Sequence, residues 1–175
     1  MADQAKNWED VKSYSLDEQA EQALYDAQIE CTLIWASKDG WPMGVIVNYI
    51  QRQGRFWLTA SEERPRVKQI RNDPRVCIAI SSKGSSIVER QSLTYKCEAI
   101  VHDDRETLDW VLPEFAAAMR PGDPEKAQAF LTMLDSPGRV VFELIPVKRV
   151  GFDSAKMWAA SEAARPTDSP SGPKN

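Results

Sequence analysis

The fold of this chain is easiest to infer from residues 55–80, which read RFWLTASEERPRVKQIRNDPRVCIAI. Residues 55–59 are rich in aromatic and apolar side chains and predict a strand. Pro65 is tolerated only in the first turn of a helix, and Pro74 disfavours helical backbone at the residue before it. A short helix is therefore expected from about Pro65 to Asn72, followed by a buried strand from Val76 to Ile80.

Two strands are expected before this stretch. Cys31 to Ala36 is rich in β-formers, and the turn at residues 38–40 leads into a second strand from Met43 to Gln51. Gln53-Gly54 then joins that strand to residues 55–59. Both connections have hairpin length, so these three strands are predicted to form an antiparallel meander.

Two longer strands and several helices complete the prediction. The strands are Leu93 to His102 and Val140 to Val150, and Pro146 places part of the latter at an edge or a bulge. Ser15 to Glu18 matches a capping box with Ser15 as N-cap, so a helix is expected from about Leu16 to Gln28. Helical spacing also predicts two helices within residues 105–134. Six or so antiparallel strands with peripheral helices indicate a mainly β fold of the α+β class, a closed or nearly closed barrel.

The composition of the 175 residues suits one domain with its own core, at 42% hydrophobic and 27% charged residues. The net charge of -4 argues against nucleic acid as a partner, so any basic site must be local. We expect a flexible segment at residues 1–14, the barrel at 15–160, and a disordered Pro- and Ser-rich tail at 161–175. With no signal peptide and no bilayer-spanning run, a cytoplasmic protein without a membrane partner is expected.

The cysteines and the single histidine offer little for catalysis. Cys31, Cys77 and Cys97 each lie in an apolar run without CxxC or Cys/His spacing, which predicts buried thiols and no metal site. His102 is the only histidine, which removes most forms of a nucleophilic triad. Beside two aspartates at a strand end, His102 is expected to be a solvated surface residue.

Residues 59–68 carry the most chemical information. A strand delivers Thr59 and Ser61, which share one face, into the N-terminus of the predicted helix, where free N–H groups favour an anion. Arg64 and Lys68 lie four residues apart on one helix face. A phosphate site is one interpretation. The other is a solvated basic helix with Ser61 as an ordinary N-cap, and the residues alone leave both open.

The motifs together resemble the pyridoxamine 5′-phosphate oxidase-like family, the flavin-binding split barrels that include flavin/deazaflavin oxidoreductases. The resemblance covers about residues 24–156 and depends most on Arg64 to Val76, which ends in DPRV. It also uses the hairpin segments 31–45 and 54–59, residues 95–99, and residues 147–153 with Lys156. The resemblance implies an antiparallel six-stranded split β-barrel that works as a homodimer, with the cofactor ring in a cleft between the two chains.

The resemblance also implies which residues contact the cofactor. Trp158 could cover the ring from the partner subunit, or it could pack against its own barrel. Tyr49 and Lys96 are minor candidates for donating a proton, and no catalytic residue is assigned. Vitamin B6 oxidation itself is not expected, because in the family it needs additional arginine and histidine side chains near the C-terminus, and only Arg149 and Arg165 lie there. The implied phosphate ligands are Thr59, Ser61, Arg64 and Lys68, and the residues implied beside the ring are Val45, Ile46, Val47 and Asn48.

The function implied is an oxidoreductase that binds FMN and transfers hydride to or from a small conjugated substrate. Coenzyme F420 is the alternative cofactor, since Arg64, Arg66, Lys68 and Arg71 could serve its longer anionic tail. A non-catalytic protein that binds or stores flavin or a tetrapyrrole is the alternative from another class. The substrate and the role of the helical insertion at 105–134 stay open at this stage.

Overall fold

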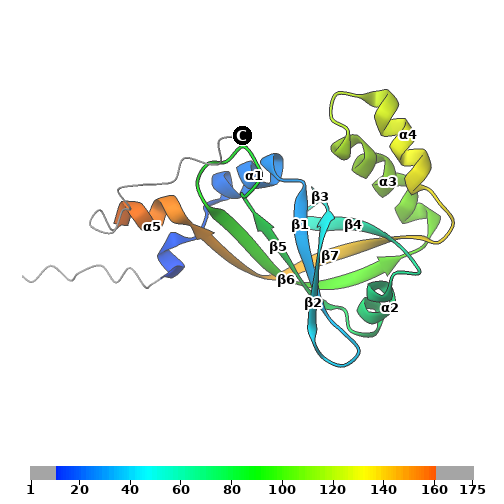
Figure 1. Ribbon diagram of the computed structural model, residues 1–175, viewed down its shortest axis with the longest axis horizontal. Helices are drawn as coiled ribbons and strands as arrows, with labels where there is room; N and C mark the ends of the chain where they lie inside the picture. Colours follow the sequence, from blue (N-terminus) through cyan, green and yellow to red (C-terminus); the bar gives the residue numbers. More distant parts are fainter. Residues whose placement is uncertain (1–10, 161–175) are drawn as a thin grey trace, which may run out of the picture.

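A curled antiparallel sheet forms the centre of the computed structural model, which describes residues 11–160 (Figure 1). Its seven strands lie in the order β2-β1-β5-β6-β7-β4-β3. The strands are β1 (Glu30–Ala36), β2 (Pro42–Asn48), β3 (Ile50–Arg52), β4 (Arg55–Ser61), β5 (Arg75–Ser81), β6 (Gln91–His102) and β7 (Arg139–Asp153). The predicted antiparallel barrel with peripheral helices is therefore confirmed.

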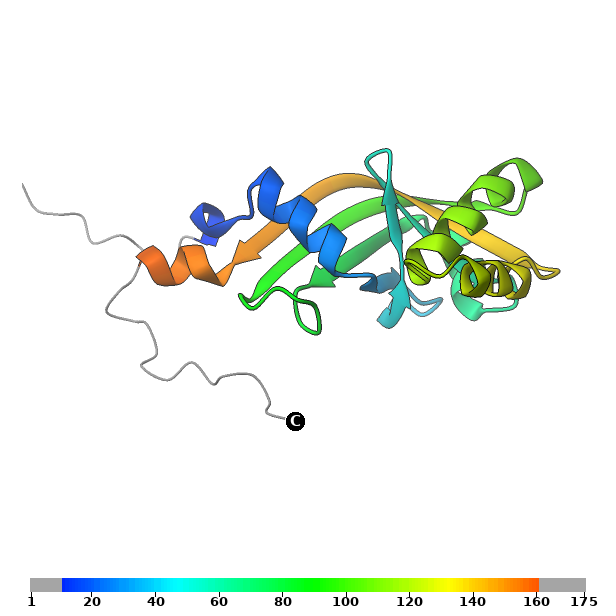
Figure 2. The ribbon, with the colours of Figure 1, turned by 90° about the horizontal axis from the view of Figure 1, so that it is seen from above.

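The strand count is seven rather than six because the predicted strand Met43 to Gln51 is divided at Tyr49. β2 pairs with β1, whereas β3 pairs with β4, so the two halves lie at opposite ends of the strand order. A single residue therefore connects the two edges of the sheet and brings them together (Figure 2). The expected meander holds for each hairpin separately and is wrong for the three strands as one unit.

The strands alternate between an apolar interior and an outer face, as period-two burial requires. In β1, for example, Cys31, Leu33 and Trp35 point into the main core. The largest fully buried interior side chains include Phe56, Phe142, Leu33, Leu58, Ile78, Ile80, Leu93 and Leu144. The core consequently fills the barrel.

The long strands β6 and β7 carry the irregularity that Pro146 predicts. Their register shifts between Lys96, which faces Lys148, and Cys97, which faces Pro146. Val147 is thus an extra residue on β7. A proline lacks the N–H that a regular ladder needs, so the bulge absorbs it.

Helices lie at the ends of the barrel and over part of its outer face. Helices α3 (Arg105–Met119) and α4 (Pro124–Leu134) pack over β4 and β7, where a second apolar cluster includes Trp57, Val141 and Phe115. This helical pair corresponds to the predicted insertion. The helices are α1 (Glu18–Ala27), α2 (Pro65–Asn72), α3 (Arg105–Met119), α4 (Pro124–Leu134) and α5 (Ser154–Ala160), with a 3-10 turn η1 (Val11–Tyr14).

The predicted start and cap of the first helix are wrong. Asp17, not Ser15, caps α1, and its carboxylate accepts a hydrogen bond of 2.9 Å from the N–H of Ala20. Leu16 is buried against the barrel and precedes the helix, which starts at Glu18. Residues 11–14, expected to be flexible, form η1 with Tyr14 buried. The rest of that segment and the predicted tail at 161–175 lie outside the described residues.

Among residues 11–160, no helix covers the outer face of β2, β1, β5 and the facing part of β6 and β7. Ile46 on β2 is 72% exposed and Val150 on β7 is 60% exposed. Between them the strands present small or β-branched side chains such as Thr32, Ile34 and Ala79. We call this surface the open sheet face. None of the described helices combines the length and apolar character needed to span a bilayer.

Candidate functional site

The backbone N–H groups at the N-terminus of α2 are not capped by a side chain. β4 ends at Ser61, whose carbonyl accepts a hydrogen bond of 3.0 Å from the N–H of Arg64. Arg64 is the N-cap residue, and no side chain caps the helix. Pro65 occupies the first helical turn, as predicted. The interpretation of Ser61 as a routine N-cap is therefore wrong, and the positive end of this short helix stays available to an anion.

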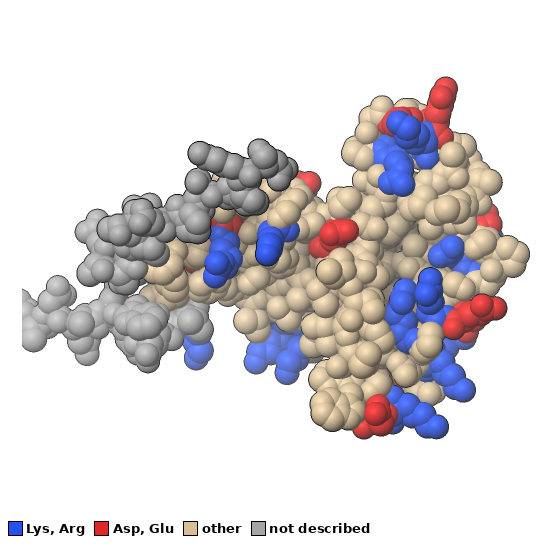
Figure 3. Space-filling model, in the orientation of Figure 1, with Lys and Arg blue, Asp and Glu red and all other residues tan. Residues whose placement is uncertain are grey.

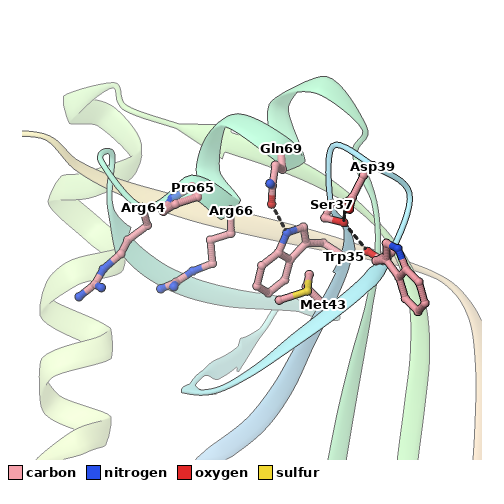
Figure 4. Close-up of a pocket in the computed structure, with 9 residues that line it drawn as sticks. Trp35, Ser37, Asp39, Met43, Arg64, Pro65, Arg66 and Gln69 are labelled. Atoms are coloured by element: carbon pink, nitrogen blue, oxygen red, sulfur yellow. Dashed lines mark hydrogen bonds between the residues drawn. The ribbon is translucent and has the colours of Figure 1, made fainter.

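Two guanidinium groups lie beside this terminus. Arg64 and Arg66 extend side by side from the start of α2 (Figure 4). The Nε of Arg66 is buried and has no hydrogen-bond partner among the described residues. Burial, and then the charge of Arg64, lower the pKa of Arg66. An anion placed between the two side chains would accept a hydrogen bond from the buried Nε–H. It would also offset the repulsion between the two positive charges.

An apolar wall adjoins the two arginines. Trp35, Trp41 and Met43 line the same pocket, which has a volume of about 620 Å³. The indole N–H of Trp35 donates a hydrogen bond of 2.5 Å to the side-chain oxygen of Gln69, which ties the barrel wall to α2 (Figure 4). The pocket, called the arginine pocket below, therefore combines an aromatic surface with a cationic rim.

One carboxylate also lines the arginine pocket. Asp39, in the turn between β1 and β2, accepts a hydrogen bond of 2.5 Å from the hydroxyl of Ser37. This bond and the backbone N–H of Asp39 lower the pKa of its carboxyl group, so it is an anion at neutral pH. The Ser37 hydroxyl also lies 2.9 Å from the carbonyl oxygen of Trp41, which fixes the turn.

The residues predicted to hold the phosphate divide among different positions. Thr59 donates its hydroxyl to the carbonyl of Val140 at 3.0 Å, across the ladder to β7. Ser61 is half-buried at the end of β4. Arg64 lines the arginine pocket, but Lys68 lines a second pocket on the other side of Pro65 and Gln69. The structure therefore pairs Arg64 with Arg66, and not with Lys68.

The residues predicted beside the ring occupy both faces of β2. Val45 and Val47 pack partly against the barrel core, whereas Ile46 is exposed on the open sheet face. The amide of Asn48 donates a hydrogen bond of 3.4 Å to the carbonyl of Ile29. Trp158 lies on α5, at the opposite end of the long axis from α2 (Figure 1). Within one chain, Trp158 and the arginine pocket are not brought together.

Three other residues named from the sequence have clear positions. The hydroxyl of Tyr49 is buried in the barrel and has no partner among the described residues, so it cannot reach a substrate at the surface. Lys96 is exposed on the open sheet face, opposite Cys77. Cys31 and Cys97 are buried and Cys77 is half-buried, all three as free thiols.

The prediction of a solvated surface histidine is wrong. The Nε2 of His102 lies 2.8 Å from a carboxylate oxygen of Glu143, and only 21% of the histidine side chain is exposed. Glu143 is almost fully buried and also pairs with Arg55. The packing of α3 over Trp57 covers this cluster, which local sequence around His102 gives no means to anticipate.

Sequence patterns did not select Trp35, Met43 or Gln69 as site residues. Trp35 reads as a core residue of its strand, and its indole N–H gains a partner only when α2 folds back against β1. Trp41 and Met43 follow the turn between β1 and β2, where exposed apolar residues are the only signal that the sequence offers.

Comparison with known proteins identifies the fold. A family model described as pyridoxamine 5′-phosphate oxidase matches residues 17–149. A solved structure of a conserved hypothetical protein from Mycobacterium tuberculosis is similar, with TM-score 0.71 and 16% identity over 83% of this chain and 89% of that chain. A search of curated proteins found no match.

Two further structures are similar in fold. One is a FAD-binding protein from Mesorhizobium loti, with TM-score 0.60 and 14% identity over 79% of this chain and 94% of that chain. The other is HutZ, the haem storage protein from Vibrio cholerae, with TM-score 0.59 and 16% identity over 78% of this chain and 94% of that chain. At these identities the likeness concerns the fold alone. Because the family model spans most of the residues and the predicted strands, the chain belongs to the pyridoxamine 5′-phosphate oxidase family.

Proposed function

We propose that this protein is a flavin-dependent oxidoreductase that anchors the phosphate of FMN at the start of α2. The observation that carries the proposal is the buried, unpartnered Nε of Arg66 beside Arg64. An uncapped helix N-terminus adjoins these two groups. A phosphate would accept hydrogen bonds from both guanidiniums and neutralise their repulsion.

The surroundings of the arginine pocket suit the rest of the cofactor. Trp35 and Met43 give an apolar wall against which a planar ring can pack and exclude water. In the proposed complex Val45 to Asn48 run beside the ring and Ser61 assists the phosphate, whereas Thr59 would first have to release the carbonyl of Val140 to donate to it. Lys68, predicted from the sequence to hold the phosphate, lines the neighbouring pocket and is not part of the proposed FMN site.

The proposed functional unit is a homodimer that buries the open sheet face. This face exposes Ile46, Val147 and Val150, a set of apolar side chains that water solvates poorly. A second copy seated there would place the ring between two chains. It would also allow Trp158 of the partner subunit to reach the ring, which the distance between α5 and α2 prevents within one chain.

In the proposed enzyme the cofactor and the chain have separate roles. Bound FMN would supply the hydride chemistry. The chain would supply position: Arg64 and Arg66 hold the phosphate, and the wall of Trp35 and Met43 excludes water. The substrate class we propose is a small conjugated molecule that stacks over the ring.

Two alternatives compete with this proposal. The first replaces FMN with coenzyme F420, which also carries a phosphate. The second is a non-catalytic protein that binds or stores flavin or a tetrapyrrole. Haem is the less favoured ligand, because His102 is engaged with Glu143 beneath the ring of Trp57 and would have to leave that pair to bind iron.

The test is titration of the purified full-length protein with FMN, followed by flavin fluorescence. Arg64→Ala with Arg66→Ala removes two charge-assisted contacts worth roughly 1.5–3 kcal/mol each, so affinity should fall about 100-fold or more. Arg90→Ala, an exposed arginine in the loop before β6, is the matched control and should bind as the wild type does. Equal affinity in all three proteins would refute the phosphate site.

Catalysis and storage are separated by a second measurement. In an oxidoreductase, the bound FMN should be reduced by an added reductant and reoxidised by an electron-accepting substrate over many cycles. A storage protein should bind the cofactor with the same dependence on Arg64 and Arg66 and show no turnover. Absence of turnover across a panel of conjugated acceptors would favour storage.

A further inference from the structure

A second pocket adjoins the arginine pocket and has cations of its own. It measures about 620 Å³ and lies between α2 and the turn that joins β1 to β2. Ser37, Pro65 and Gln69 line both pockets, so the two adjoin each other at the first turns of α2. Lys38 from the turn and Lys68 from the helix reach this second pocket, which we call the lysine pocket.

The charges that line the lysine pocket are only partly balanced. Arg75 donates to both carboxylate oxygens of Asp73 at 2.8 and 2.7 Å, and these bonds hold the pKa of Asp73 at about 2. That arginine is therefore neutralised at physiological pH. Lys38 and Lys68 make no ion pair with any described residue, and both are exposed.

Another cation of α2 is excluded from this role. Arg71 donates to Glu62 at 3.0 Å and to Asp103 at 3.1 Å, so two carboxylates already balance its charge. Lysines and arginines gather over α2 and the tip of the hairpin in Figure 3, although the whole chain carries a net charge of -4. The unbalanced part of this local charge lies in the two adjoining pockets, where Asp39 offsets one of the cations.

We infer that the lysine pocket binds a second anionic group, a carboxylate or a phosphate, next to the phosphate held by Arg64 and Arg66. The inference rests on the proposed function, because the first anion fixes where the second must lie. Ammonium groups on flexible stems suit such a group, since they follow an anion as point charges without demanding the planar geometry of an arginine pair.

The inference separates the cofactor candidates by their chemistry. FMN ends at a single phosphate, so it would fill the arginine pocket and leave Lys38 and Lys68 without a partner. A cofactor whose chain continues beyond its phosphate into carboxylates, as in coenzyme F420, would fill both pockets. A separate anionic molecule bound beside FMN would supply the same chemistry from a second source.

The experiment is calorimetric titration of the full-length protein, its Lys38→Gln/Lys68→Gln variant, and a Lys83→Gln control. Lys83 is an exposed lysine in the loop between β5 and β6, away from both pockets. Each protein is titrated with FMN and with coenzyme F420. The FMN-saturated proteins are then titrated with inorganic pyrophosphate. Thermal unfolding checks that the variants, which change only exposed side chains, are folded.

A loss of about tenfold or more for F420, with FMN affinity unchanged within twofold, supports the inference and assigns the second anion to the cofactor tail. Pyrophosphate binding to the FMN-loaded protein that the double lysine variant abolishes supports it with a separate molecule as the source. If the lysine variant binds every probe as the wild type does, the inference is wrong. The proposed function then still stands or falls by the Arg64 and Arg66 variants alone.

Discussion

Arg66 is the residue whose burial is hardest to explain by structure alone. Its Nε lacks a partner and its guanidinium lies near that of Arg64, which costs the unliganded fold free energy. Arg66→Met keeps the aliphatic stem and removes both costs. We expect the variant without cofactor to be as stable as the wild type or more stable by up to about 1 kcal/mol, while FMN affinity falls. Thermal unfolding without cofactor measures the first effect.

Arg71→Met is the control for this prediction. Its guanidinium pairs with Glu62 and Asp103 at the surface, so its loss should cost between 0 and about 1 kcal/mol. A destabilisation of Arg66→Met clearly larger than that of Arg71→Met would show that Arg66 serves the fold rather than a ligand.

Two tyrosines in the barrel should respond oppositely to loss of their hydroxyl groups. The hydroxyl of Tyr49 is buried without a partner, whereas that of Tyr95 lies 2.6 Å from the hydroxyl of Tyr25 and also pairs with Glu21. Burial and the bond to Glu21 raise the pKa of Tyr95 to about 12. We expect Tyr49→Phe to be neutral or slightly stabilising, and Tyr95→Phe to cost about 1–2 kcal/mol in urea unfolding. Equal losses in both variants would contradict this contrast.

Glu143 connects three strands of the sheet through its side chain. From β7 it pairs with Arg55 on β4 and with His102 on β6, beneath α3. Its side chain is 5% exposed, so Glu143→Ala leaves its partners without a buried counter-charge. We expect a loss of about 2–3 kcal/mol in unfolding free energy, less than for a fully buried pair because Arg55 can reach water.

The control for this element is Glu114→Ala. Its ion pair with Arg52 is about half exposed at both ends, so its loss should cost less than about 1 kcal/mol. Urea denaturation followed by tryptophan fluorescence suits both variants, because Trp57 and Trp110 are packed against each other between the barrel and α3. If Glu143→Ala lowers the unfolding free energy no more than Glu114→Ala does, the pairs of Glu143 stabilise the fold no more than an exposed ion pair does.

At the scale of the whole molecule, the two halves of the barrel's outer surface are covered differently. Helices α3 and α4 cover one half, and the other half is the open sheet face proposed to bind a second copy. Ile46→Asp places a charge on the β2 edge of that face and should convert a dimer to a monomer in analytical ultracentrifugation. Val88→Asp, at a 93% exposed site on a loop, should leave the assembly unchanged. A dimer that survives Ile46→Asp would place the interface elsewhere.

Much of the fold follows from local patterns that need no tertiary information. The strand at residues 55–59, the helix at Pro65–Asn72 and the strand that follows it were predicted within two residues of the observed bounds. Proline stereochemistry and β-propensity act over a few residues, so they can be recognised one segment at a time. The bulge at Pro146 was predictable for the same reason. The division of one strand at Tyr49 was not, because it depends on which partner strand each half meets.

Residues 55–72 alone are enough to predict that a strand leads into a short helix with a basic N-terminus, and that this terminus suits an anion. Which cations lie together there depends on how the chain folds around the helix. Helical spacing suggested Arg64 with Lys68, but the β1–β2 hairpin packs against α2 between them, so that Arg64 and Arg66 share one pocket and Lys68 joins Lys38 in the next. The geometry of a helix sets the direction of its side chains and can be inferred from nearby residues. The walls of a pocket, in contrast, come from segments that are distant in the sequence.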